Sequence, residues 1–123
     1  MRLRCECPVD TKIVLDKLKF KQALANVVRN AIQASPLHSE VVVRGMVRDD
    51  LAEVTVSDRG SGIPERDRAA VFTPFFTTKE HGTGLGLPIA REFVEAHGGT
   101  LELDSTQPVR GAAFVFRLPL RRT

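Results

Sequence analysis

The sequence is poor in the features that cross-link small proteins. Cys5 and Cys7 are its only cysteines, and their spacing in an alternating segment places both on one side of a predicted strand. That geometry does not suit a disulfide, and neither further cysteines nor paired histidines lie nearby to complete a metal site. We therefore expect an ordinary structural role for both, in a reducing compartment.

Long apolar runs and a strong charge of one sign are also missing. No window approaches the ~18 apolar residues of a membrane span, and residues 1–10 lack the apolar stretch of a secretory signal. The 18 basic and 15 acidic residues leave a net charge of +3, far from the dense basic stripe of a nucleic-acid-binding protein. We expect no insertion into a membrane and no nucleic-acid partner.

The remaining composition is that of one globular domain. Of the 123 residues, 42% are hydrophobic and 27% charged, and no repeat, low-complexity run or linker divides them. A chain of this length buries roughly two-thirds of the surface that it exposes when unfolded. We therefore predict a single domain over residues 1–123.

Hydrophobic periodicity predicts the order of secondary structure. Short β-rich runs predict strands at residues 3–7, 41–47, 51–57, 100–104 and 112–118. Helical spacing predicts helices over residues 18–34 and 85–96, the second ending at His97-Gly98-Gly99. This order predicts an α/β two-layer sandwich with a mixed, mostly antiparallel sheet.

Four amide side chains follow one face of the first predicted helix. Gln22, Asn26, Asn30 and Gln33 lie at steps of four, four and three residues beside the apolar face. Asn is roughly 0.5 kcal/mol worse than Ala in a helix, and a solvated face more commonly carries Lys, Glu or Arg. The stripe is therefore either a binding surface or a plain polar face.

Two glycine clusters allow a ligand to approach the backbone closely. The predicted strand 51–57 is followed by Asp58-Arg59-Gly60-Ser61-Gly62, whose carboxylate could accept a hydrogen bond from an exocyclic amine. The second predicted helix is preceded by Gly82-Thr83-Gly84-Leu85-Gly86-Leu87, which offers amides and a helix dipole to phosphate oxygens. An acidic turn and a glycine-rich lid without ligand are the alternatives.

The segment between these clusters, residues 72–79, concentrates three of the seven phenylalanines and has neither helical nor strand periodicity. Its aromatic side chains are either anchors for a mobile lid or parts of the core, and both can hold, because a lid must pack somewhere when closed.

Taken in order, the four elements resemble the ATP-binding catalytic domain of sensor histidine kinases, in the superfamily of DNA gyrase, heat-shock chaperone and mismatch-repair ATPases. Each element resembles one of the conserved boxes of that family. Residues 26–31 resemble the N box and residues 58–62 the first glycine box, while residues 72–79 resemble the F box and residues 82–87 the second glycine box. Residues 75–79 and 95–99 further resemble the nitrogen-regulation and oxygen-sensing type. The resemblance implies the Bergerat-type ATP-binding fold, in which helices cover one face of the sheet.

The resemblance also implies a role in Mg-ATP binding for each box. Asn30 would ligate Mg²⁺ through its neutral amide oxygen, and Asn26 would contact the metal or the phosphates directly or through water. Asp58 would bind the adenine amino group. The other nucleotide-binding positions that the resemblance implies are Gly60, Gly62, Ile63, Phe72, Thr78, Gly82, Thr83, Gly84, Leu85, Gly86 and Leu87.

One position departs from the family pattern. Many members carry Lys or Arg three residues after the metal-binding Asn, where this chain has Gln33. The charge of the γ-phosphate must then be met elsewhere, and Lys79, as a catalytic point charge, and Arg29 are the candidates.

The histidine that accepts phosphate in these kinases lies on a separate helical hairpin, and His38, His81 and His97 lack its sequence setting. We therefore expect the catalytic domain of a longer kinase, with the dimerisation and phosphoacceptor hairpin as direct partner and a response regulator as indirect partner. We expect no direct membrane contact and a cytoplasmic location, whether or not the parent kinase is membrane-anchored.

Two other classes of function are alternatives. An ATP-hydrolysing switch of the chaperone or gyrase type would carry a Glu general base where this chain has Asn26, and an amide cannot take a proton from water. A binding module without catalysis would be favoured by eroded motifs, whereas all four motifs are intact. The resemblance therefore favours a protein-histidine kinase.

Overall fold

A computed structural model of the chain describes residues 2–6, 17–35, 39–60, 70–73, 86–104 and 111–119, and for residues 2–6, 17 and 34 the backbone only. The elements are β1 (Arg2–Glu6), α1 (Lys17–Ala34), β2 (Glu40–Arg48), β3 (Leu51–Ser57), α2 (Gly86–Ala96), β4 (Thr100–Leu103) and β5 (Ala113–Pro119). Each predicted element is present, with its ends within one residue of the prediction. Cys7 lies outside the described residues.

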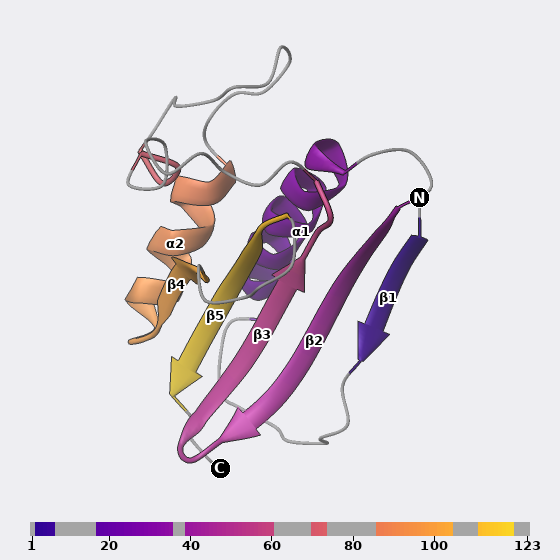
Figure 1. The fold of residues 1–123 in the computed structure, drawn as a ribbon. Helices are drawn as coiled ribbons and strands as arrows, with labels where there is room; N and C mark the ends of the chain where they lie inside the picture. Colours follow the sequence, from indigo (N-terminus) through magenta and orange to yellow (C-terminus); the bar gives the residue numbers. More distant parts are fainter. Residues whose placement is uncertain are drawn as a thin grey trace.

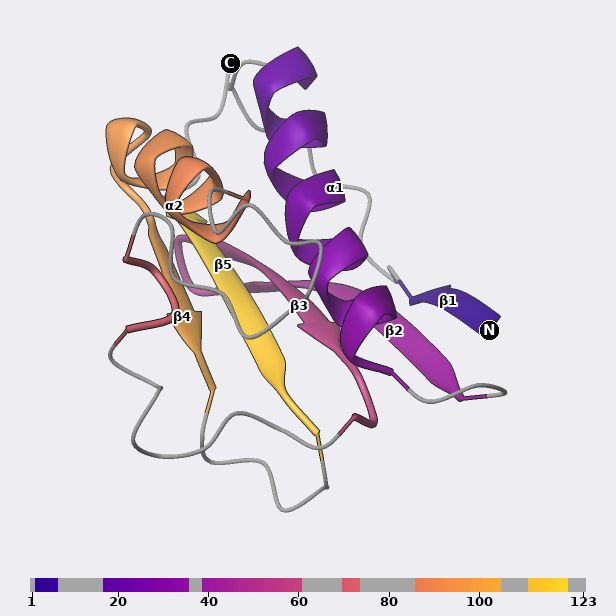
Figure 2. The same cartoon turned by 90° about the horizontal axis from the view of Figure 1, so that it is seen from above.

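The five strands form one sheet in the order β1-β2-β3-β5-β4. β1 runs parallel to β2, and every other neighbouring pair is antiparallel. Both helices cover the same face of this sheet (Figures 1 and 2). The prediction of a two-layer α/β sandwich with a mixed, mostly antiparallel sheet is therefore confirmed.

The core lies between the sheet and the two helices. Phe114, Phe116 and Leu118 alternate along β5 and are buried, as the period-2 geometry of a strand requires of one face. Phe20 of α1 packs against Phe116 and against Phe93 of α2, with ring centroids 6.0 and 6.2 Å away. Full burial of a ring such as Phe116 stabilises the fold by about 1.5–3 kcal/mol, and the partly buried rings of Phe20 and Phe93 pack both helices against this part of the core.

The end of α2 is a Schellman turn. The N–H of Gly98 donates to Glu95 O at 3.0 Å and the N–H of Gly99 to Val94 O at 2.9 Å, while Gly98 adopts a φ of 78°. A Cβ at Gly99 would lie 2.2 Å from Arg117 O, so the turn also packs directly against β5. The predicted end of the helix at residues 97–99 is confirmed.

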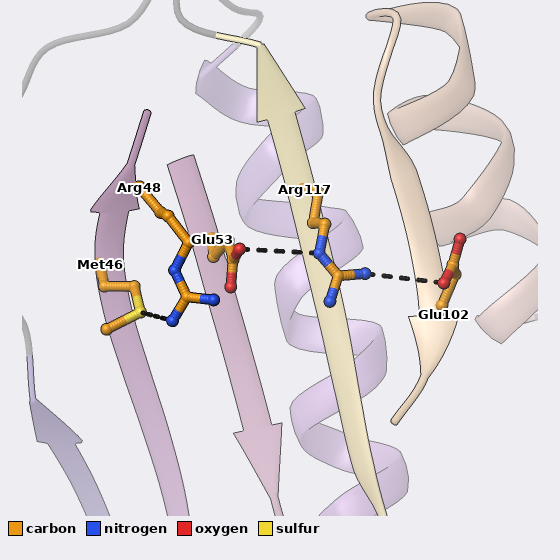
Figure 3. A network of polar contacts seen from close by, with 5 residues as sticks. All are labelled: Met46, Arg48, Glu53, Glu102 and Arg117. Carbon is orange, nitrogen blue, oxygen red and sulfur yellow. Dashed lines mark hydrogen bonds and ion pairs between the residues drawn. The ribbon is translucent and has the colours of Figure 1, made fainter. Parts of the chain in front are cut away.

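The opposite face of the sheet carries polar side chains, as expected for an antiparallel sheet with one solvated face. Arg117 lies between two carboxylates, with Nε 3.7 Å from Glu53 Oε1 and Nη1 3.6 Å from Glu102 Oε2 (Figure 3). On β2, Arg48 Nη2 donates to Met46 Sδ at 3.7 Å. Neither helix in the described part of the chain is long and apolar enough to cross a membrane.

Candidate functional site

Four elements that carry predicted site residues, or lie directly beside them, meet at one end of the sheet, which is the upper end in Figure 1. There α1 and β3 end, and α2 and β5 begin (Figures 1 and 2). Asp58 follows the last residue of β3, and Gly86 is the first residue of α2. We call this edge, marked by Asn30, Asp58, Gly86 and Gly111, the site end of the sheet.

Asp58 is the one charged side chain that is buried among the described residues, with 4% of its surface exposed. Its Oδ1 accepts hydrogen bonds from the N–H of Gly60 at 2.8 Å and from the N–H of Ala112 at 3.2 Å. A buried carboxylate needs such partners, because the loss of its hydration is otherwise costly. The backbone N–H groups of Gly60 and Ala112 thus fix Oδ1, whereas none of the described residues donates a hydrogen bond to Oδ2.

The four amide side chains of α1 differ in their exposure to solvent. Ala23, Val27 and Ala31 form the buried face of the helix, and Asn26 and Asn30 are half-buried beside it. Gln22 and Gln33, which lie at the two ends of the stripe, are exposed. The two asparagines to which the resemblance assigns roles therefore differ from the glutamines in their surroundings.

Asn26 and the start of α2 are in direct contact range. An ideal Cβ placed on Gly86 would lie 3.6 Å from Asn26 Cβ and 3.8 Å from Asn26 Cγ, which is ordinary van der Waals contact. The last glycine of the second glycine cluster therefore lies over the first asparagine of the amide stripe. Two motifs separated by more than fifty residues of sequence come together at the site end.

Phe72 joins the start of the aromatic segment to the core. Its ring meets Phe114 edge-on at 6.0 Å between centroids, and Arg91 Cζ of α2 lies 4.5 Å above it. Val71 beside it is buried, and the N–H of Thr73 donates to Ala70 O at 2.9 Å to close a turn. Core packing is thus observed for Phe72, while its predicted contact with nucleotide stays a prediction.

The remaining predicted residues are only partly placed. Leu87 is half-buried and packs against the core, which leaves its predicted role to its backbone amide. Arg29 is exposed, so the choice between it and Lys79 as the partner of the γ-phosphate stays open. Outside the described residues lie Gly62, Ile63, Thr78, Lys79, Gly82, Thr83, Gly84, Leu85, His38 and His81.

The structure adds Gly111, Ala112 and Arg91 to the neighbourhood of the predicted residues. A glycine at the start of a β-rich run indicates a close approach of another backbone, and this signal is present at Gly111. Nothing in the local sequence relates it to Asp58, because the contact arises from the pairing of β3 with β5.

These residues fit a magnesium-bound adenine nucleotide. Asn30 supplies a neutral amide oxygen of the kind that Mg²⁺ accepts. Asp58 supplies a buried carboxylate oxygen that can accept a hydrogen bond from an amine. Gly86 opens an 11-residue helix whose first amides point to the site end, where a phosphate is favoured.

Comparison with known proteins gives consistent matches. Residues 15–122 match the family described as histidine kinase-, DNA gyrase B-, and HSP90-like ATPase. The chain is 40% identical over 116 residues to the sensor histidine kinase ZraS of Klebsiella oxytoca, covering 92% of this chain and 24% of that protein. The chain therefore spans about a quarter of the length of this relative.

Solved structures agree with the sequence match. The mycobacterial sensor histidine kinase MprB superposes with a TM-score of 0.87 at 32% identity, covering 99% of this chain and 85% of that one. Full-length ShkA in complex with AMPPNP superposes with a TM-score of 0.86 at 27% identity, covering 99% of this chain and 26% of that one.

Proposed function

Because the chain belongs to the family of histidine kinase-, DNA gyrase B- and HSP90-like ATPases, we propose that it binds Mg-ATP and donates the γ-phosphoryl group to a histidine on a separate dimerisation domain. The relatives that support this proposal are proteins named sensor histidine kinases. The observation that carries it is the buried Asp58 carboxylate, fixed through Oδ1 at the site end of the sheet.

Asp58 is the residue that we assign to the adenine base. Its Oδ2 would accept a hydrogen bond from the exocyclic amino group, while the N–H groups of Gly60 and Ala112 hold Oδ1. Asn30, in the last turns of α1, would ligate Mg²⁺, and Asn26 beside Gly86 would contact the metal or the phosphates. The chemistry of transfer belongs to the bound Mg-ATP, and these residues orient it.

Transfer is favoured over hydrolysis by the composition of α1. The helix contains no Asp or Glu, and the half-buried position one turn before Asn30 is Asn26. An amide cannot accept a proton from an attacking water, so α1 offers no general base for hydrolysis. Slow hydrolysis preserves ATP for a histidine acceptor. An ATP-hydrolysing switch is the alternative function.

The proposed partners follow from the activity. The direct partner is the dimerisation and phosphoacceptor hairpin of the parent kinase, and a response regulator receives the phosphoryl group from that hairpin. We propose a cytoplasmic location for the domain, where ATP is available.

The proposal is tested by mixing the chain with labelled Mg-ATP and a dimerisation hairpin of the parent kinase. Acid-labile, alkali-stable phosphate should appear on the hairpin histidine. Asn30→Ala should abolish transfer by removing the metal ligand, while Gln33→Ala, an exposed amide on the same helix, should retain it. Rapid release of inorganic phosphate without hairpin would favour the switch instead, and full transfer by Asn30→Ala would remove Asn30 from the metal site.

A further inference from the structure

Residues 111 and 112 meet Asp58 through three separate contacts. The N–H of Asp58 donates to Ala112 O at 2.9 Å, and the N–H of Ala112 donates back to Asp58 Oδ1 at 3.2 Å. The third contact is steric, because the α-carbon of Gly111 lies close to the Asp58 carbonyl group. The backbone before β5 therefore holds both the main chain and the carboxylate of Asp58.

Gly111 is the residue that permits this approach. A Cβ at that position would lie 2.1 Å from Asp58 O, 2.8 Å from Asp58 C and 3.0 Å from Arg59 Cα. These atoms belong to the backbone and cannot rotate away. The φ of Gly111 is 119°, a conformation that residues with side chains rarely adopt. Any other residue would therefore push the Asp58 backbone away from Ala112.

We propose that Gly111 and Ala112 are positioning residues that set the selectivity of the site for adenine by fixing the Asp58 carboxylate. This inference rests on the proposed function, because it needs Asp58 to receive the adenine amino group. A hydrogen bond weakens steeply once its atoms separate well beyond about 3 Å or lose alignment. A displaced Asp58 would thus lose the amino group, while the phosphates, bound at α1 and α2, would keep their contacts.

The chain offers a matched control at the other end of β5. A Cβ at Gly99 would lie 2.2 Å from Arg117 O, 3.0 Å from Leu118 Cδ2 and 3.1 Å from Val94 Cγ1. Gly99→Ala therefore introduces a clash with a carbonyl oxygen at nearly the same distance as Gly111→Ala, without the strain of a positive φ. Gly99 contacts the last turn of α2 and the end of β5, and it makes no contact with Asp58.

The test compares ADP with purine riboside diphosphate, which is ADP without the amino group. Calorimetry gives the dissociation constants of both ligands for the wild type, Gly111→Ala and Gly99→Ala. We expect the wild type and Gly99→Ala to bind ADP at least about tenfold more tightly than the analogue. In Gly111→Ala the two dissociation constants should lie within about threefold of each other, with most of the change in the ADP value.

The outcomes separate the inference from the proposed function. A wild type that binds both ligands equally would remove the amino group from recognition, and the adenine assignment and this inference would fall together. A wild type that discriminates while Gly111→Ala keeps the full ratio would overturn the inference alone. An equal loss of the ratio in Gly99→Ala would overturn it too, since general destabilisation would then be sufficient.

A second substitution covers the case in which Gly111→Ala does not fold. Incorporation of L-lactic acid in place of Ala112 removes the N–H that donates to Asp58 Oδ1 and keeps the methyl side chain. We expect the ratio of the two dissociation constants to fall at least about threefold, which corresponds to the loss of one hydrogen bond that holds the carboxylate. An unchanged ratio of the two dissociation constants would contradict the proposed role of Ala112 in holding the Asp58 carboxylate.

Discussion

At the scale of single residues, the proposed role of Asp58 in binding adenine can be tested by a substitution that keeps the shape of its side chain. Asp58→Asn retains the shape of the side chain and the oxygen that Gly60 and Ala112 contact, but it removes the charge. Loss of a charged acceptor costs about 1.5–3 kcal/mol, which is a loss of ADP affinity of about tenfold or more. Titration calorimetry with ADP measures this change.

The control for that substitution is Asp49→Asn. Asp49 is exposed in the hairpin between β2 and β3, at the opposite end of the sheet, and its φ of 54° is one that Asn also adopts readily. ADP affinity should be unchanged in this variant. Equal ADP affinity in Asp58→Asn and the wild type would exclude Asp58 from the adenine site.

Asn26 distinguishes transfer from hydrolysis. Asn26→Glu introduces a carboxylate one helical turn before Asn30, where the related ATPases carry their general base. A positioned base accelerates proton transfer by about 10²–10⁴-fold, and we expect the lower end of that range because a newly introduced Glu is not held in line with an attacking water by neighbouring groups. Release of inorganic phosphate from Mg-ATP measures the effect. No increase over the wild type would show that residue 26 cannot reach the water.

The candidate side chains of the site could be proposed from the sequence, but the backbone that holds one of them could not. Asn26, Asn30 and Asp58 belong to local motifs, so a short stretch of sequence is sufficient to propose them. Ala112 is hydrogen-bonded to Asp58 across 54 positions of sequence, and Gly111 permits this approach because it has no Cβ. Local patterns carry no information on such contacts, which depend on the strand order of the sheet.

At the scale of elements, the contact between Arg91 and Phe72 connects α2 with the segment at residues 70–73. The Arg91 guanidinium lies over the Phe72 ring at a partly exposed position, where a cation–π contact is worth about 0.5–1 kcal/mol. A double-mutant cycle with Arg91→Ala and Phe72→Leu should therefore give a coupling free energy of unfolding of about that size. Urea denaturation of the four proteins provides the measurement.

The matched cycle uses the other partner of Arg91. Arg91 Nε lies 3.4 Å from Glu95 Oε1, four residues along α2, and both side chains are well exposed. An exposed pair of this kind couples by about 0.3–0.5 kcal/mol and loses that coupling at high salt. Absence of coupling between Arg91 and Phe72 would contradict a cation–π contact. So would a coupling that disappears in high salt, as the coupling between Arg91 and Glu95 should.

The helices and strands could be predicted from the sequence, but the order of the strands in the sheet could not. Each helix and strand was predicted to within one residue, because periodicity, Pro and Gly mark their ends locally. Strand periodicity gives the buried face of a strand but not its neighbour. The insertion of β5 between β3 and β4, and the parallel pairing of β1 with β2, therefore required the structure.

At the scale of the whole molecule, the chain should not phosphorylate itself. His97 lies just beyond the C-terminal end of α2, where its Nδ1 is 3.1 Å from Phe93 O and its ring packs on Phe93 at 4.4 Å. The site end is at the other end of this 11-residue helix, roughly 16 Å away at 1.5 Å per residue. Incubation with labelled Mg-ATP alone should leave no acid-labile phosphate. Label on His97, His38 or His81 would contradict a separate acceptor.

Binding of an adenine nucleotide at the site end of the sheet can be tested by a crystal structure of the chain with Mg²⁺ and a non-hydrolysable ATP analogue. We expect the adenine amino group to lie within hydrogen-bonding distance of Asp58 Oδ2, and Mg²⁺ to be ligated by the amide oxygen of Asn30. Gly60 and Ala112 should continue to hold Asp58 Oδ1 in that complex. A base bound away from Asp58 would contradict the proposed adenine site, and a magnesium ion without contact to Asn30 would contradict the proposed metal site.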